Sequence, residues 1–185
     1  MSRTDAGTLW TIGHSVRSWE EFAGMLTAAR INALVDVRRF AGSRRNPQFS
    51  GETMGAALER ESVDYLPMPD LGGRRPVRED SPNLAWRNAG FRGYADYMET
   101  LPYQAARERL AKLARVKRTA VMCAEAMWWQ CHRSLISDDL KADGWQVIHL
   151  LSPGREQEHP YTSAARIVEG RLDYTLPADR QPSLF

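Results

Sequence analysis

The sequence predicts a single-domain, three-layer α/β fold of the Rossmann-like type, with a mostly parallel sheet and helices on both faces. Three observations support this prediction. The chain has 185 residues, close to the size of one ordinary domain. It opens with a β-type run at Leu9–Ile12, a helical pattern after Ser18 and a nearly continuous apolar run at Ile31–Val37. Strands buried in parallel sheets are typically such apolar runs, and strand–helix–strand is how a parallel α/β sheet begins.

The remaining elements follow the same alternation. Ser18 followed by Glu21 forms a capping box, which predicts that the first helix begins there. Helices are further expected over 52–60, 94–100, 103–116 and 131–142, and strands over 63–68, 119–123, 146–151 and, as a short edge strand, 172–176. Residues 69–88 are rich in Pro, Gly and Arg and predict a long loop, and loops of this length are usually functional or mobile.

Composition is typical of a globular protein, since 43% of the residues are hydrophobic and 26% are charged. The longest apolar runs, such as Ile31–Val35, are too short to span a bilayer. The first ten residues lack the pattern of a secretory signal, so we expect a cytoplasmic protein without membrane partners. Two cysteines cannot form a disulfide framework, and in a reducing compartment both thiols are expected to be free. We expect one domain over 1–176 and a flexible tail over 177–185.

Three chemically informative segments follow predicted strands. They are Thr11–Ser15, Asp36–Arg39, and Met122–Glu125 with its continuation to Cys131-His132-Arg133. Sites in parallel α/β sheets form beyond the carboxyl ends of the strands. The sequence therefore predicts that these segments converge on one site.

The same segments carry a resemblance to a known family. The matching stretches are Thr11–Ser15, Leu34–Arg38, Ser43–Phe49, Leu71–Arg74, Phe91–Met98, Met122–Glu125 and Cys131–Arg133, with His149 and His159 fitting the usual ending. Together they resemble the bacterial and archaeal family catalogued as domain of unknown function 488. The resemblance implies an α/β fold and a site near the Cys-His-Arg stretch. It does not imply a particular reaction.

The group Cys123, Cys131 and His132 has three interpretations. With His149 or His159 it could complete a metal site, although Cys-x7-Cys-His is not a usual ligand spacing, and no metal ligand is assigned. Cys131 falls near a predicted helix N-terminus, where the dipole lowers a thiol pKa, and so it is a candidate nucleophile with His132 beside it. In the third interpretation both cysteines pack as small apolar residues. The sequence also identifies no cofactor.

Two carboxylates and a histidine are the other candidate catalytic groups. Asp36 and Glu125 lie at or just after predicted strand ends, and paired carboxylates serve general acid–base hydrolysis. His14, beside a glycine at a strand end, is a candidate acid–base group. The alternatives are an ion pair of Asp36 with Arg38 and a salt bridge of Glu125 with Arg133.

Arginine dominates the basic residues, since only three of the 25 are lysines. Its planar fork of donors suits phosphate. Seven arginines are candidate phosphate ligands, namely Arg38, Arg39, Arg44, Arg45, Arg74, Arg75 and Arg133. The nearby aromatic residues that could stack on bases are Trp86, Phe91, Tyr94, Trp128 and Trp129. The alternatives are a solvated arginine surface and aromatic residues that belong to the core.

The last five residues, Gln181-Pro182-Ser183-Leu184-Phe185, resemble the bacterial sliding-clamp-binding motif Gln-x-x-Leu-Phe. Gln181 supplies an amide for hydrogen bonds, and Leu184 with Phe185 fits an apolar pocket. Pro182 stands where the motif favours leucine, which lowers the expected affinity. In the alternative, Leu184 and Phe185 fold back onto the domain.

These observations together favour a protein that acts on DNA or on a nucleotide. We expect a hydrolase of a glycosidic or phosphodiester bond that a sliding clamp recruits to replication or repair sites. One alternative is a non-catalytic DNA-binding adaptor tethered to the clamp. Another is a small-molecule thiol enzyme that uses Cys131.

Deletion of residues 181–185 should abolish binding to the sliding clamp without affecting folding. Burial of Leu184 and Phe185 is worth roughly 1.5–3 kcal/mol each, and ordering the tail offsets part of this, so the expected affinity is micromolar. Calorimetry of the intact and truncated proteins with the clamp measures it. Absence of a complex with the intact protein at roughly tens of micromolar would contradict the assignment.

Overall fold

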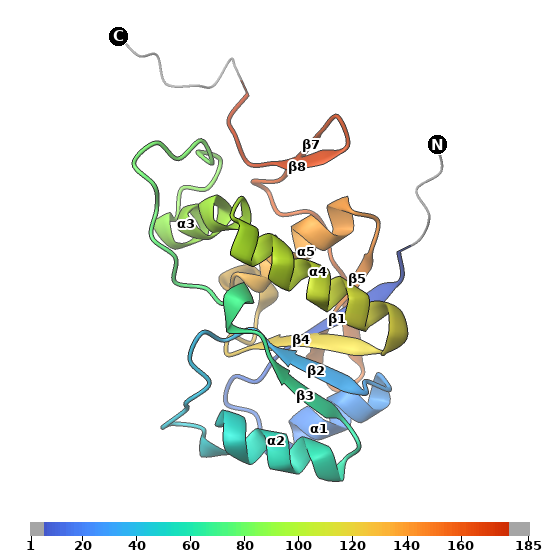
Figure 1. Ribbon diagram of the computed structural model, residues 1–185. Helices are drawn as coiled ribbons and strands as arrows, with labels where there is room; N and C mark the ends of the chain where they lie inside the picture. Colours follow the sequence, from blue (N-terminus) through green and yellow to red (C-terminus); the bar gives the residue numbers. More distant parts are fainter. Residues whose placement is uncertain (1–5, 178–185) are drawn as a thin grey trace.

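The computed structural model describes residues 6–177, and it is built on a six-stranded sheet in the order β3-β2-β4-β1-β5-β6 (Figure 1). Five strands are parallel, and β6 pairs antiparallel with β5 at one edge. The strands are β1 Thr8–Gly13, β2 Ala33–Asp36, β3 Asp64–Pro67, β4 Thr119–Cys123, β5 Gln146–Ser152 and β6 Arg155–Glu158. The predicted fold class is confirmed.

Helices cover both faces of the sheet, with α1 and α2 on one face and α3, α4 and α5 on the other (Figure 1). Their bounds are α1 Trp19–Ala28, α2 Gly51–Arg60, α3 Ala89–Met98, α4 Leu101–Val116 and α5 Arg133–Ala142. The predicted cap of α1 is confirmed, because the Ser18 hydroxyl accepts a hydrogen bond from the Glu21 amide at 3.1 Å.

Each face of the sheet has its own buried apolar cluster. Successive strand residues alternate between the two clusters, so that Leu34 faces one and Val35 the other. Phe22 of α1 lies in the first cluster, and Leu110 of α4 and Leu135 of α5 lie in the second. Because both faces are covered, the central strands are mostly apolar, as the sequence predicted.

The structure corrects the prediction in three places. Strand β6 was not predicted, because its residues are polar or charged and mostly exposed, and it lies at a sheet edge. The short strand expected over 172–176 is β8 (Arg171–Asp173), which pairs with β7 (Arg166–Val168) in a separate two-stranded sheet. Helix α3 begins five residues earlier than expected, since the Asn88 side chain accepts from the Phe91 amide and caps it.

The tail over 177–185 falls outside the described residues except for its first position. The predicted clamp-binding residues Gln181, Leu184 and Phe185 therefore have no structural description. Among the helices of residues 6–177, none is both long enough and apolar enough to cross a membrane.

The topology creates a switch point between β2 and β4. Strand β2 leads through α2 to β3 on one side, and β4 leads through α5 to β5 on the other. In parallel α/β sheets, sites form where adjacent strands have diverging connections, at the carboxyl ends of the strands, which point to the left in Figure 1. Gly13 lies at this edge, where a Cβ atom would overlap the Glu125 carbonyl. Only glycine lets the segment after β4 approach the end of β1 so closely.

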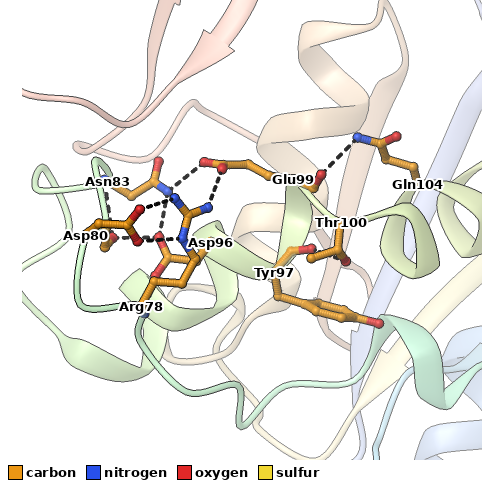
Figure 2. A network of polar contacts seen from close by, with 9 residues as sticks. Arg78, Asp80, Asn83, Asp96, Tyr97, Glu99, Thr100 and Gln104 are labelled. Atoms are coloured by element: carbon orange, nitrogen blue, oxygen red, sulfur yellow. Dashed lines mark hydrogen bonds and ion pairs between the residues drawn. The ribbon is translucent and has the colours of Figure 1, made fainter.

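The long loop over 72–88 is held on α3 by a polar network (Figure 2). The buried Asp96 carboxylate accepts hydrogen bonds from the Ser81 hydroxyl at 2.5 Å, the Asn83 amide at 2.9 Å and the Arg78 backbone at 2.9 Å. Arg78 also bonds Glu99 at 2.9 Å. The buried Asp96 carboxylate thus fixes the conformation of a loop whose own sequence favours no regular structure.

Replacing Asp96 with alanine should lower the free energy of unfolding by about 1–3 kcal/mol, because the buried Asn83 amide loses its acceptor, as do the less buried Ser81 hydroxyl and Arg78 backbone amide. Burial raises the pKa of Asp96, but the hydrogen bonds from Ser81 and Asn83 outweigh this and lower it below 3.8. The stabilisation is therefore present above that pH and is lost as the pH falls through the lowered pKa. Urea unfolding measures the effect. The matched control is Asp80→Ala, an exposed carboxylate on the same loop, which should leave the free energy of unfolding nearly unchanged. Equal effects would contradict the assignment.

Candidate active site

The first part of the site is an ion pair at the end of β2. Arg38 donates to both carboxylate oxygens of Asp36, with Nε 2.9 Å from Oδ1 and Nη2 2.7 Å from Oδ2. The Tyr65 hydroxyl donates to the same carboxylate at 2.7 Å. Asp36 and Arg38 are both buried. The structure thus supports the ion-pair interpretation of Asp36, since its oxygens are already occupied.

His14 lies against this ion pair at the end of β1. Its Nδ1 is 2.9 Å from the Ser15 carbonyl, so Nδ1 carries the proton, and Nε2 accepts from Arg38 Nη1 at 3.3 Å. The ring stacks on Phe49 with centroids 4.6 Å apart. Burial lowers the pKa of His14, and the hydrogen bond to Ser15 offsets this only in part. The neutral imidazole therefore holds the guanidinium of Arg38 in place.

Glu125, the other predicted catalytic carboxylate, is exposed on the segment after β4. Among the described residues, the hydrogen bonds of the Asp36 carboxylate come from Arg38 and Tyr65. The structure therefore does not join Asp36 and Glu125 in one hydrogen-bonded pair, because one is buried in an ion pair and the other is exposed.

The two cysteines meet above the sheet. Cys123 ends β4, Cys131 precedes α5, and their sulfur atoms are paired as a disulfide with Cα atoms 7.6 Å apart. The expectation of two free thiols is corrected, because α5 turns back over β4 and brings the sulfur atoms together. Both residues are buried, at 2% and 5% exposed.

Hydrogen-bond donors converge on both sulfur atoms. Arg133 Nε lies 3.0 Å from Cys123 Sγ, and the Arg133 backbone amide, at the start of α5, lies 3.4 Å from Cys131 Sγ. His132 Nε2 donates to the Val37 carbonyl at 3.2 Å, which leaves Nδ1 as an acceptor 3.6 Å from Cys131 Sγ. Burial lowers the pKa of His132 to about 4, so the ring is neutral. Reduction of the disulfide would therefore leave the Cys131 thiol beside an oriented base.

Arg133 is the largest fully buried side chain, at 1% exposed. Its Nη2 donates to the Glu125 carbonyl at 2.5 Å and its Nη1 to the Thr11 hydroxyl at 3.3 Å. Within residues 6–177, no carboxylate forms an ion pair with this guanidinium. Burial lowers the pKa of Arg133 to about 9, and the charge of Glu125 opposes this. A buried cation without a carboxylate stabilises any negative charge that forms on the adjacent sulfur.

A buried polar chain runs from Arg133 into the protein. Thr11 Oγ1 is 2.6 Å from His149 Nδ1, His149 Nε2 is 2.8 Å from His159 Nδ1, and His159 Nε2 is 2.9 Å from Asp138 Oδ1. The two histidines are thus satisfied by each other and by their neighbours, and the described residues contain no cluster able to hold a metal ion.

Sequence reasoning placed Thr11 in a segment at the site without giving it a role of its own, and it missed Tyr65 and Asp138. Asp138 gave one usable signal, because it occupies the buried face of α5 three residues after Leu135, where a charged residue needs a partner. Thr11 and Tyr65 lie in strands, where their hydroxyl groups gave no local sign of a role.

The seven candidate phosphate-binding arginines divide into two groups. Arg38 and Arg133 are buried, and Arg75 stacks on Tyr97 with its guanidinium carbon 3.7 Å from the ring centroid. The exposed arginines are Arg39, Arg44, Arg45 and Arg74. Arg39 donates to the Arg74 carbonyl at 3.0 Å, which joins the loop after β2 to the loop over 72–88. These four, which we call the exposed arginines, remain available to an anion in solution.

The predicted base-stacking aromatics are mostly internal. Tyr94 and Trp128 are buried, and Trp86 and Phe91 pack together with ring centroids 4.9 Å apart. Trp129 is 48% exposed. Phe40, which sequence reasoning did not select, is 67% exposed beside the exposed arginines.

Comparison with known proteins identifies the family. The family model described as Domain of unknown function DUF488 matches residues 18–140, about two thirds of the chain. The chain therefore belongs to this family, which confirms the resemblance found in the sequence. No curated protein and no solved structure gives a significant match.

The buried histidines should make the protein sensitive to mild acid. Burial lowers the pKa of His149 to about 2, so this ring stays neutral in the folded protein while the unfolded chain takes up a proton below pH 6.5. Stability is then full above pH 6.5 and falls as the pH drops below it. At pH 5 the loss from His149 is about 2 kcal/mol.

Urea unfolding of the reduced protein at pH 7.5 and at pH 5.0 measures this loss. His149→Phe should reduce the difference between the two pH values by about that amount, whatever its effect at pH 7.5. An unchanged difference in the variant would show that His149 does not carry the acid sensitivity.

Proposed function

We propose that the protein is a thiol-dependent enzyme that exchanges electrons with small anionic disulfides. Cys131 is the attacking thiol and Cys123 is the resolving thiol. The observation that supports this most directly is the buried guanidinium of Arg133, which places Nε 3.0 Å from Cys123 Sγ and its backbone amide 3.4 Å from Cys131 Sγ. Nearby positive charge and hydrogen bonds to the anionic form lower a thiol pKa and raise the fraction of reactive thiolate.

The first step uses the base beside Cys131. His132 Nδ1 accepts the Cys131 proton, and the thiolate attacks one sulfur of the substrate disulfide. The substrate S–S bond breaks, its other sulfur leaves with the electron pair and takes up a proton, and a mixed disulfide remains on Cys131. One disulfide is replaced by another in this step, so no external oxidant or reductant is needed.

The second step uses Cys123. Its thiolate, stabilised by Arg133, attacks the Cys131 sulfur and releases the second substrate thiol. The substrate is then reduced by two electrons, and the protein carries the Cys123–Cys131 disulfide that the structure contains. An external dithiol restores the reduced pair. When that dithiol attacks Cys131, the Cys123 sulfur is the leaving group, and a lower pKa makes it leave faster.

Size and charge define the proposed substrate class. Both cysteine residues are more than nine-tenths buried, which favours a small substrate. The guanidinium groups that follow the strand ends, including the exposed arginines, favour a substrate that carries carboxylate or phosphate groups. An aromatic disulfide that bears carboxylates and releases a coloured thiolate is a suitable probe.

The released thiolate tests the roles of the two cysteines. The reduced wild-type protein should release two equivalents from the probe and end as the internal disulfide. Cys123→Ser should release one equivalent and retain one probe half on Cys131, which mass spectrometry detects. Cys131→Ser should react at least roughly tenfold more slowly, because Cys123 has no oriented base. Equal rates in wild type and Cys131→Ser would refute the proposal.

A second candidate function is supported by the surface of the same edge. The exposed arginines lie with the exposed rings of Phe40 and Trp129 on loops beyond the carboxyl ends of the strands. Arginines that contact phosphates and aromatic rings that stack on bases are the usual elements of a nucleic-acid surface. This supports the proposal that the protein binds DNA or a nucleotide, with Glu125 as the exposed carboxylate for hydrolysis; the clamp-binding tail remains a proposal from the sequence alone.

Changing Arg44 and Arg45 together to alanine should weaken binding to single-stranded DNA and flatten its salt dependence by up to about 1.4 in the log–log slope. Fluorescence anisotropy over a range of salt concentrations measures both. Changing Arg107 and Arg109 of α4 to alanine is a charge-matched control, since both arginines are on another element and already bind carboxylates. No DNA binding by the wild-type protein at low salt would exclude this second function.

A further inference from the structure

The buried chain of Asp138, His159, His149 and Thr11 is not used by the proposed reaction steps, although it ends on Arg133. It joins α5, the segment after β6, β5 and β1 through side chains that are at most 2% exposed. Each contact in it is between 2.6 and 2.9 Å. Trp128 covers His149, with the rings nearly parallel at 7° and centroids 4.6 Å apart. The chain is therefore continuous and shielded from water.

Asp138 fixes the direction of the hydrogen bonds at one end. Its carboxylate accepts from the Thr162 amide at 2.9 Å, from the Thr162 hydroxyl at 2.6 Å and from the Tyr174 hydroxyl at 2.8 Å. A carboxylate that only accepts is ionised, so His159 Nε2 must carry a proton and donate to it. With His159 as a neutral imidazole, its Nδ1 atom is then an acceptor.

The hydrogen-bond directions of the remaining groups, as far as Arg133, follow in the same way. His149 Nε2 donates to His159 Nδ1, which leaves His149 Nδ1 as an acceptor for the Thr11 hydroxyl hydrogen. With its hydrogen committed to His149, the Thr11 oxygen presents lone pairs to Arg133 Nη1 at 3.3 Å. Every donor therefore points from the guanidinium toward Asp138.

We propose that Thr11, His149, His159 and Asp138 are positioning residues that hold the Arg133 guanidinium with its Nε on Cys123 and so set the reactivity of that thiol. The inference rests on the proposed function in one respect, that Cys123 acts as a thiolate. An arginine side chain has several rotatable bonds, and in an apolar interior its direction is set by its acceptors. The Thr11 oxygen, together with the Glu125 carbonyl, keeps Nη1 and Nη2 engaged while Nε faces the sulfur.

The groups that act on the Cys123 sulfur come from several elements. Arg133 of α5 donates to it directly, Cys131 lies beside it, and His132 precedes Arg133. Glu125 and Arg17 act on Arg133 through their charges. Among these groups only Arg133 both carries a charge and bonds Cys123 Sγ, so its orientation is the property that a change in the buried chain alters.

The test titrates Cys123 alone, in the full-length Cys131→Ser protein, where it is the only thiol. Thiolate absorbance against pH gives its pKa. Adding Thr11→Val removes the hydroxyl at nearly constant volume and should raise the Cys123 pKa by about half a unit to one unit, which is roughly a threefold to tenfold loss of thiolate below the midpoint. Thr11→Ser keeps the hydroxyl and should restore the Cys131→Ser value.

His149→Phe is the second variant, since it keeps a ring against Trp128 but removes the acceptor of the Thr11 hydroxyl. It should raise the Cys123 pKa in the same direction as Thr11→Val. Asp96→Asn is the control for lost stability, because Asp96 belongs to the separate network on α3 and should leave the thiol pKa unchanged. The proposal is overturned if Thr11→Val and Thr11→Ser titrate alike, or if Asp96→Asn shifts the thiol as much.

The titration distinguishes this inference from the proposed function. It is read in a protein that cannot turn over, so an enzyme that fails to reduce disulfides can still show the shift. Conversely, an unchanged titration in active protein would remove the positioning role and leave the reaction in place.

Discussion

The structure depends on the burial of one positive charge. Arg133 is enclosed at the start of α5, and its guanidinium is satisfied by a sulfur, a hydroxyl and backbone carbonyls. Removing a cation from water costs several kcal/mol unless its partners compensate. The partners come from the ends of β1 and β4 and from the segment that follows β4. The requirement to satisfy this charge therefore fixes how these parts meet.

A second buried arginine, at the end of β2, is held differently. Arg38 has a carboxylate partner in Asp36, which also accepts from Tyr65, and it donates to His14. That guanidinium is neutralised and held, whereas the charge of Arg133 is left for the sulfur of Cys123. Because Asp36 is already paired and the Arg133 charge faces a sulfur atom, we assign the proposed reaction to the cysteines rather than to the carboxylates.

The sequence predicted the sheet and the convergence of the strand ends because both are local properties. Apolar runs such as Ile31–Val37 identify buried strands, and the residues after each strand lie at one edge by the geometry of parallel pairing. It also placed Cys131, His132 and Arg133 together at a helix start. Which partner each group selects depends on contacts between distant segments, such as Asp36 with Tyr65 or Thr11 with His149, and no local pattern contains these. The pairing of the two cysteines was missed for the same reason.

The measurement that tests the central claim most directly is the pKa of Cys123 in three proteins. These are the Cys131→Ser variant itself and the same variant with Arg133→Lys or Arg133→Met added. The account predicts a pKa below the ordinary thiol value of about 8.5 with arginine, a value close to it with lysine, and a higher value with methionine, because burial without the cation disfavours the thiolate. A Cys123 pKa above about 8.5 that does not change when Arg133 becomes methionine would contradict the account.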